Sequence, residues 1–218
     1  MRSVFRLWWS LVTFGFRLLY NELAFTYDTV STIVSLGAWR CWQRQALKFL
    51  PASTDGIVLE LAHGTGNLQI DLKTRGYATI GYDLSPNMGK ITRRKLLKRS
   101  LSVDLIRGQA QTLPFAEGGF QAVVSTFPTS FIVEESTLRE IWRVLKPGGT
   151  LIIVPNGALV GGGIVNSFIE WLYRITGQRG ASMDGFKQYF EKHGFTAEIV
   201  YENCPRSVAT VIICHKMV

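Results

Sequence analysis

A glycine-containing turn and one acid at the end of an apolar segment are the residues best placed to do chemistry in this chain. The apolar segment 57–61 leads into a turn that holds Gly64 and Gly66, and a second apolar segment, 79–82, ends at Asp83. In an open parallel sheet, such a turn lets a ligand approach the backbone, and an acid after the second strand accepts hydrogen bonds from ribose hydroxyls. The spacing therefore predicts a site for a ribose-bearing cofactor.

The glycines of this turn do not follow the G-x-G-x-x-G pattern, so a dinucleotide is not the natural interpretation. The segment E-L-A-H-G-T-G at 60–66 instead resembles the E/D-x-G-x-G-x-G loop with which class I methyltransferases bind S-adenosylmethionine (SAM). Ala62 stands at the first glycine position of that loop. Its methyl group is tolerated at a negative φ and unfavourable at a positive φ.

Three further segments carry the same resemblance, and together the matching segments cover about residues 55–155. They are D-L-S-P-N-M at 83–88, G-Q-A-Q-T-L-P-F at 108–115 and L-R-E-I-W-R-V-L-K-P-G-G at 138–149. The chain thus resembles the quinone-biosynthesis-like branch (methyltransferase type 11) of the class I enzymes. Upstream, Tyr27-Asp28 resembles a Y-D pair of that branch, whose tyrosine lies near the methionine end of SAM.

The resemblance implies a set of cofactor contacts. Asp83 would bind the ribose, and Leu84 and Met88 would pack against the adenine. Gln109 stands where an aspartate usually accepts a hydrogen bond from the adenine amino group; its amide oxygen can still accept, but without charge. A second departure is Gln121, which replaces the usual acid at the start of the fourth strand. The expected residues for SAM, and for its product S-adenosylhomocysteine (SAH), are Tyr27, Glu60, Ala62, His63, Gly64, Gly66, Asp83, Leu84, Met88, Gln109, Ala110 and Thr126.

Methyl transfer from a sulfonium depends mainly on alignment, because the cofactor supplies the reactive group. A general base is needed only where the acceptor must lose a proton. His63, in the cofactor loop, and Tyr27 are the candidates for that role, and the alternative for His63 is packing within the loop. Phe127-Pro128, after the fourth strand, is either a trace of the loop that receives the amine in amine-methylating relatives or a plain turn.

Strands and helices alternate after residue 55, which favours an α/β fold with a mostly parallel sheet covered on both faces. The resemblance implies a doubly wound seven-stranded sheet, the Rossmann-like methyltransferase fold, with an antiparallel last strand and with SAM at the carboxyl ends of strands one to four. The expected strands are 57–61, 79–83, 103–107, 121–127, 151–154, 196–202 and 207–214. The expected helices are about 67–75, 86–99, 138–145 and 183–193.

The chain is expected to consist of two parts, with a boundary at about residue 54. Residues 1–54 form an N-terminal helical extension, and residues 55–218 form the SAM-binding domain. Within that domain, the glycines 161–163 could hinge an apolar helix, so that 158–182 is either a substrate lid or part of the core.

The N-terminal segment 2–21 predicts an amphipathic helix with a basic polar face opposite Trp, Phe and Leu side chains. Its longest uncharged run, 7–16, is too short to span a bilayer, and no signal-peptidase site follows it. Such a helix lies in a membrane interface, or else it packs on the domain or on a second subunit as in a homodimer.

Composition supports the membrane interpretation. The chain has 218 residues, is 47% hydrophobic and carries a formal net charge of +8, which suits an anionic membrane surface at least as well as nucleic acid. Six cations lie in the segment 90–99. They form either a solvated helix face or a site for lipid phosphates or RNA, but no RNA-binding module accompanies them. The three cysteines are an odd number and far apart, which favours free thiols in a reducing compartment and no metal site.

These observations lead to one hypothesis and two alternatives. The chain is expected to be a SAM-dependent methyltransferase that acts on a small amphipathic or lipidic acceptor, either a quinone precursor or a phospholipid headgroup. It would work in the cytoplasm, as a peripheral protein on the inner face of the cell membrane. The alternatives are a methyltransferase of nucleic acid or protein, suggested by the positive charge, and a non-catalytic SAM-binding module, suggested by Ala62, Gln109 and Gln121.

Overall fold

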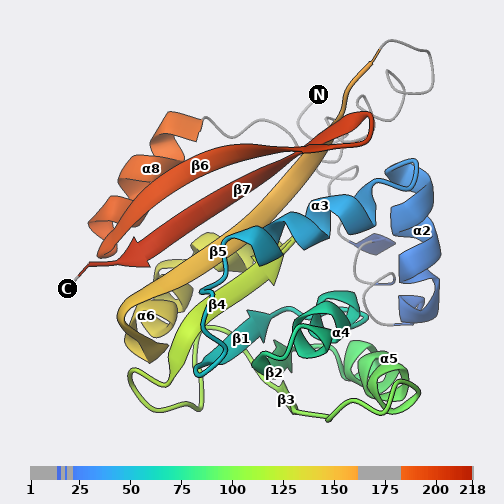
Figure 1. The fold of residues 1–218 in the computed structure, drawn as a ribbon, viewed down its shortest axis with the longest axis horizontal. Helices are drawn as coiled ribbons and strands as arrows, with labels where there is room; N and C mark the ends of the chain where they lie inside the picture. Colours follow the sequence, from blue (N-terminus) through green and yellow to red (C-terminus); the bar gives the residue numbers. More distant parts are fainter. Residues whose placement is uncertain (1–13, 16–17, 19–21, 162–182, 218) are drawn as a thin grey trace.

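A twisted seven-stranded sheet organises the protein (Figure 1), in the order β3-β2-β1-β4-β5-β7-β6. The computed structural model describes residues 14–15, 18, 22–161 and 183–217. The strands are β1 (Ile57–Leu61), β2 (Ala78–Asp83), β3 (Leu105–Arg107), β4 (Phe120–Thr126), β5 (Leu145–Leu159), β6 (Phe195–Cys204) and β7 (Ser207–Lys216). Strands β1 to β5 pair in parallel, whereas β7 is antiparallel to both of its neighbours. The expected α/β class, seven strands and antiparallel last strand are confirmed.

Helices connect the strands. They are α2 (Tyr27–Val34), α3 (Trp39–Gln45), α4 (Asn67–Thr74), α5 (Pro86–Leu97), α6 (Glu135–Val144) and α8 (Met183–Lys192), with short 3₁₀ turns η1 (Ala24–Thr26), η2 (Ala46–Lys48) and η3 (Ser130–Val133). In Figure 1, α8 lies beside β6 at one end of the sheet, and α4 and α5 lie at the end formed by β2 and β3.

Alternation along the strands divides the core into two layers, because successive side chains of a strand point to opposite faces. Odd-numbered residues such as Leu59 and Val123 pack with α6 and α8. Even-numbered residues such as Val58 and Val124 pack with α4 and with the segment around η2. Both faces of β1 and β4 are therefore buried, which explains why their sequences are almost continuously apolar.

Strand β5 is much longer than the expected 151–154. It begins at Leu145, directly after α6, and continues to Leu159. The reason lies in its partner, since β7 pairs with it from Thr150 to Leu159 and supplies hydrogen bonds beyond the parallel part of the sheet. Strand β3 is shorter than expected, because only Leu105–Arg107 pairs with β2.

The strand order reverses between β1 and β4, so the connections after these two strands leave in opposite directions. The carboxyl ends of β1, β2, β3 and β4 lie together at Leu61, Asp83, Arg107 and Thr126. In open α/β sheets this point of reversal is where a crevice for a ligand forms.

The N-terminal extension is fastened to the sheet through α3. The indole Nε1 of Trp42, which is buried, donates a hydrogen bond to Ser207 Oγ over 2.9 Å. Gly157 of β5 makes this packing possible, because a Cβ at that position would lie 2.2 Å from the Trp42 ring. Helix α3 thus rests on the β5–β7 part of the sheet (Figure 1).

The cysteines correct one expectation. Cys41 of α3 and Cys204 at the end of β6 form a disulfide, with Cα atoms 6.0 Å apart. Only Cys214 is free, and its burial raises the pKa of its thiol. Wide separation in sequence concealed the pair, since only the packing of α3 on the β6–β7 hairpin brings the two residues together. The expected three free thiols are therefore wrong, and the cysteines give no support to a reducing compartment.

Two other expectations concern residues outside the described part of the chain. The amphipathic helix at 2–21 falls almost entirely there, as does the lid at 158–182 from residue 162 onward. Among the helices that the structure describes, none has the length and apolar character needed to cross a bilayer.

Candidate functional site

A cavity of about 590 Å³ opens at the carboxyl ends of β1, β2, β3 and β4. Its walls come from the loops that follow these strands and from the start of α2. Its lining residues are Tyr27, Leu61, Ala62, Gly64, Tyr82, Asp83, Leu84, Ser85, Pro86, Met88, Arg107, Gly108, Gln109, Ala110, Gln111, Thr126, Phe127, Pro128, Thr129 and Phe131. The size lies within the range of small-molecule and cofactor sites.

Asp83 links the glycine turn to β2. Its Oδ2 accepts a hydrogen bond from the backbone N–H of Gly64 over 2.9 Å, and its Oδ1 accepts one from Ser85 N–H over 2.7 Å. The carboxylate is half-buried and lines the cavity. Each oxygen of a carboxylate can accept more than one hydrogen bond. Asp83 can therefore hold the loop and still accept from a ligand hydroxyl.

The turn itself depends on close packing behind it. Gly66, which caps the N-terminus of α4, has φ +77°. A Cβ there would lie 2.3 Å from the Thr92 side chain of α5. Gly66 therefore allows the turn to pack closely against α5, and it does not line the cavity.

Ala62 occupies a left-handed backbone conformation, with φ +55°. Its N–H donates to Tyr82 O over 2.7 Å, so the register of β1 and β2 enforces this geometry. A residue with a Cβ is strained in this region, and glycine is not. The departure from the glycine pattern therefore falls at a position where it costs backbone energy.

Glu60 is completely buried beneath the turn and does not line the cavity. Among the described residues, neither carboxyl oxygen has a hydrogen-bond partner of normal geometry. Burial raises the pKa of Glu60 to about 8; the nearby Gln69 amide opposes that rise, and Asp83 adds to it. The side chain is therefore largely protonated at neutral pH, unlike an exposed glutamate.

His63 faces away from the cavity. Its Nδ1 lies 2.9 Å from Gly64 O and 3.3 Å from Thr92 Oγ1, and only 3% of the residue is exposed. Burial is the main cause that lowers its pKa. A buried, neutral imidazole that does not line the cavity matches the packing alternative, and it lacks the access that a general base requires.

The wall expected to meet adenine is partly apolar. Leu84 and Met88 line it, Leu84 exposed and Met88 buried. Ser85 caps α5 by accepting from Met88 N–H, which fixes Met88 against the cavity. Gln109 is exposed at the rim, next to the buried Ala110.

The opposite wall combines residues from β4 and the extension. Thr126 Oγ1 accepts from Gln43 Nε2 of α3 over 3.1 Å. Tyr27 begins α2 and lines the cavity, and its ring meets Trp39 edge-on, with centroids 6.2 Å apart. The extension thus helps to build the site.

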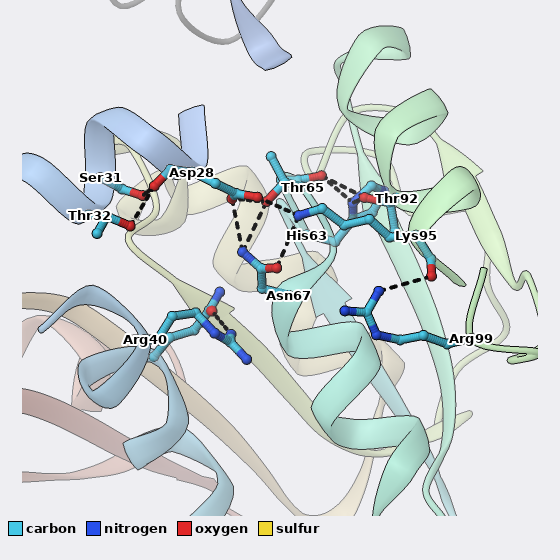
Figure 2. A network of polar contacts seen from close by, with 12 residues as sticks. Asp28, Ser31, Thr32, Arg40, His63, Thr65, Asn67, Thr92, Lys95 and Arg99 are labelled. Atoms are coloured by element: carbon cyan, nitrogen blue, oxygen red, sulfur yellow. Dashed lines mark hydrogen bonds and ion pairs between the residues drawn. The ribbon is translucent and has the colours of Figure 1, made fainter. Parts of the chain in front are cut away.

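A polar network attaches α2 to the cofactor loop (Figure 2). Asp28 accepts hydrogen bonds from Thr65 Oγ1 over 2.6 Å and from Asn67 Nδ2 over 2.9 Å, and pairs with Lys95 Nζ at 2.5 Å. Burial raises the pKa of Asp28, but Lys95, Thr65 and Asn67 together lower it further, so the net pKa lies below the usual range. Because Tyr27 precedes Asp28, this network also fixes the tyrosine at the cavity.

The sequence matches a known family over most of this architecture. The model of the ubiE/COQ5 methyltransferase family matches residues 16–189. The chain belongs to this family. Membership confirms the expected class, a SAM-dependent methyltransferase of the quinone-biosynthesis-like branch.

Two curated relatives illustrate the similarity. The demethylmenaquinone methyltransferase of Thermus thermophilus is 37% identical over 148 residues, which cover 64% of this chain and 67% of the relative. The ubiquinone/menaquinone biosynthesis C-methyltransferase UbiE of Geotalea daltonii is 28% identical over 142 residues, covering 62% and 60%. The chain spans between about half and two thirds of the length of the curated relatives it matches.

Solved structures share the fold. A SAM-dependent methyltransferase from Thermotoga maritima, a possible histamine N-methyltransferase, superposes with a TM-score of 0.59 at 22% identity and covers 87% of this chain and 94% of its own. A Haemonchus contortus phosphoethanolamine N-methyltransferase in complex with SAH gives a TM-score of 0.60 at 17% identity, covering 84% and 53%.

Most of the residues expected from the sequence line one cavity. Tyr27, Ala62, Gly64, Asp83, Leu84, Met88, Gln109, Ala110 and Thr126 do so, whereas Glu60, His63 and Gly66 do not. Sequence reasoning left Phe127-Pro128 undecided, and the lining residues that it did not assign to the site are Leu61, Tyr82, Ser85, Pro86, Arg107, Gly108, Gln111, Thr129 and Phe131. Arg107 could have been found, because it ends the third strand at the same edge of the sheet as Asp83.

Replacing Ala62 by glycine tests the strain in the turn. We expect Ala62→Gly to raise the free energy of unfolding by up to about 1 kcal/mol, because glycine adopts a positive φ without a steric cost. Ala46, with φ −54° where α3 continues into η2, is the control with a negative φ. There the same change adds flexibility and removes a buried methyl group, which lowers stability by about 1 kcal/mol or more. Urea denaturation measures both, and an equal loss at the two positions would contradict the strain.

Replacing Glu60 by glutamine tests its burial. The folded pKa of about 8 lies above the unfolded value of 4.5. The stabilisation from retaining the proton is therefore complete below pH 4.5 and is lost as pH rises to about 8. We expect Glu60→Gln to match the wild type at the acidic end. Near pH 9 it should be more stable by roughly 3–5 kcal/mol. Denaturation at several pH values measures this difference, which a pH-independent offset would refute.

Proposed function

We propose that this protein transfers a methyl group from SAM to a ring carbon of a quinol precursor. The observation that carries the proposal is the cavity at the carboxyl edge of the sheet, in which Asp83 is tied to the glycine turn. Family membership supports the same reaction, because relatives are named for C-methylation in ubiquinone and menaquinone biosynthesis.

The residues present suit the adenosyl cofactor. Asp83 would accept hydrogen bonds from the ribose, Leu84 and Met88 would enclose the adenine, and the N–H groups of the turn are close by. The sulfonium of SAM, when bound, supplies an electrophilic methyl group. The protein then needs to align acceptor and cofactor and to exclude water. Tyr27 and Phe127 would shape the acceptor side, together with Thr126, which ends β4 and is hydrogen-bonded to Gln43 of α3.

Methylation at a ring carbon also releases a proton from that carbon. The ionisable groups that line the described cavity are Tyr27, Tyr82, Asp83 and Arg107. Asp83 already accepts two backbone hydrogen bonds, and burial raises the pKa of Tyr82. A quinol loses a hydroxyl proton to become a phenolate, which activates its own ring. We therefore assign Tyr27 to orienting the acceptor hydroxyl, with proton loss completed by water.

The other hypotheses find less support. Gln121, one motive for a non-catalytic module, donates from Nε2 to Gly56 O over 2.9 Å and does not line the cavity. Arg107 is the one cation among the described lining residues, which suits a neutral ring better than a phosphate headgroup. Ala62 and Gln109 are the other two residues that suggested a non-catalytic module, and both concern the strength of cofactor binding.

A binding and turnover assay tests the proposal. We expect calorimetry to show SAH binding in the micromolar range, and incubation with SAM and a 2-unsubstituted naphthoquinol to add one methylene in mass. Asp83→Ala should weaken SAH binding by about tenfold or more, because a charge-assisted hydrogen bond is lost. Phosphoethanolamine and RNA serve as competing acceptors. Methylation of either one, with the quinol unchanged, would overturn the proposal.

We propose in addition that the enzyme works as a peripheral protein on an anionic membrane surface, through the segment 2–21. Support comes from the amphipathic pattern of that segment and from the net charge of +8. In the described part of the extension, Phe25, Ile33 and Leu36 are exposed. A location on the cytoplasmic face of the membrane is supported only by the proposed quinone-precursor function. The cysteines no longer indicate a reducing compartment, because Cys41 and Cys204 form a disulfide.

Liposome flotation tests the membrane proposal. We expect the full chain to float with vesicles that contain phosphatidylglycerol, less so at high salt, and a variant without residues 1–20 to remain in solution. Vesicles of phosphatidylcholine alone are the control for charge. Equal flotation of both proteins would remove the segment from the explanation.

A further inference from the structure

Two aromatic rings stack at one wall of the cavity. The ring centroids of Phe127 and Trp39 lie 3.7 Å apart, with 24° between their planes. Phe127 lines the cavity and Trp39 does not. Trp39 therefore supports Phe127 from behind, and Phe127 presents its remaining surface to the cavity. Tyr27 also lines the cavity, and its ring meets Trp39 edge-on at 6.2 Å, which makes this side of the site largely aromatic.

The backbone of Phe127 is held in a conformation that disfavours a large side chain. Its φ is +53°, in the left-handed region, and its N–H donates to Val154 O over 2.7 Å. For a bulky residue this conformation is strained and would be relieved by glycine. Backbone strain of this kind gathers at functional sites, where the surrounding structure enforces it. A plain turn after β4 would not require a phenylalanine here.

The support behind Phe127 is rigid. Trp39 begins α3, and the same helix is fixed by Trp42 to Ser207, by Gln43 to Thr126 and by the Cys41–Cys204 disulfide. Thr126 directly precedes Phe127, so the bond from Gln43 anchors both halves of the stack. An aromatic surface that is ordered before binding loses little entropy when a flat ligand packs on it.

We propose that Phe127, backed by Trp39, is a specificity-determining residue on which the planar ring of the acceptor stacks. This inference rests on the proposed function and names the surface that would select a fused or substituted aromatic ring over an aliphatic amine. Asp83, Leu84 and Met88 come from the end of β2 and the start of α5, and Phe127 follows β4, on the other side of β1 in the sheet. The aromatic wall is therefore separate from the residues assigned to the ribose and adenine.

Binding of an unreactive ring and binding of SAH, measured separately, test the proposal. We expect wild-type protein loaded with SAH to bind 1,4-naphthoquinone, and calorimetry measures this binding. Phe127→Ala should weaken that binding by about tenfold, and Phe127→Leu, which keeps apolar volume without a flat face, by about threefold. The Kd of SAH should stay within about twofold in both variants, because the ribose and adenine contacts assigned to Asp83, Leu84 and Met88 come from the end of β2 and the start of α5.

A third variant separates the ring from the backbone. Phe127→Gly should weaken naphthoquinone binding as much as Phe127→Ala, yet melt at a higher temperature than Phe127→Ala because glycine relaxes the positive φ. Unchanged naphthoquinone binding in folded Phe127→Ala or Phe127→Gly would overturn the proposal. So would an equal loss of SAH binding, which would mark a general structural role. Absence of naphthoquinone binding in the wild type overturns it as well.

These outcomes differ from failure of the proposed function. If wild-type protein binds SAH and naphthoquinone but methylates no quinol, the reaction is wrong and the aromatic surface stands. If it methylates the quinol while Phe127→Ala keeps the wild-type KM for that acceptor, the reaction stands and the surface is wrong.

Discussion

The hydrogen bond between Gly64 N–H and the Asp83 carboxylate is the interaction on which the site depends. It joins the turn after β1 to the end of β2, and these two strands are already in register from Ile57 to Leu61. Parallel pairing alone would bring the two loops to the same edge of the sheet. The carboxylate turns that proximity into a fixed distance, which lets one acid serve both the loop and a ligand.

The N-terminal extension belongs to this construction as much as the sheet does. Asp28 holds the back of the glycine turn through Thr65 and Asn67, and Gln43 holds Thr126 at the end of β4. Between these two anchors, Tyr27 and Phe127 face the cavity. Without these helices, the site would lose one wall.

Much of this could be predicted from sequence, because the relevant signals are local. Apolar runs gave β1, β2 and β4, and the residues that follow such strands must meet at one edge. The features that the sequence did not specify share a different cause. The direction of His63, the pairing of Cys41 with Cys204 and the stack of Trp39 on Phe127 all depend on contacts between distant segments. The length of β5 likewise depends on β7. For Ala62, the sequence predicted strain only if its φ were positive, because a sequence does not specify that angle.

The place of β7 between β5 and β6 has a consequence for biosynthesis. Residues 207–216 are translated after all the other strands, yet they fill an interior position of the sheet. Until they leave the ribosome, β5 exposes one edge from Thr150 to Leu159, and β6 has no neighbour with which to pair. The nascent chain can order β1 to β4 early, but an unpaired apolar edge invites association with other chains. The sheet can therefore be completed only once β7 has left the ribosome and can pair with both β5 and β6.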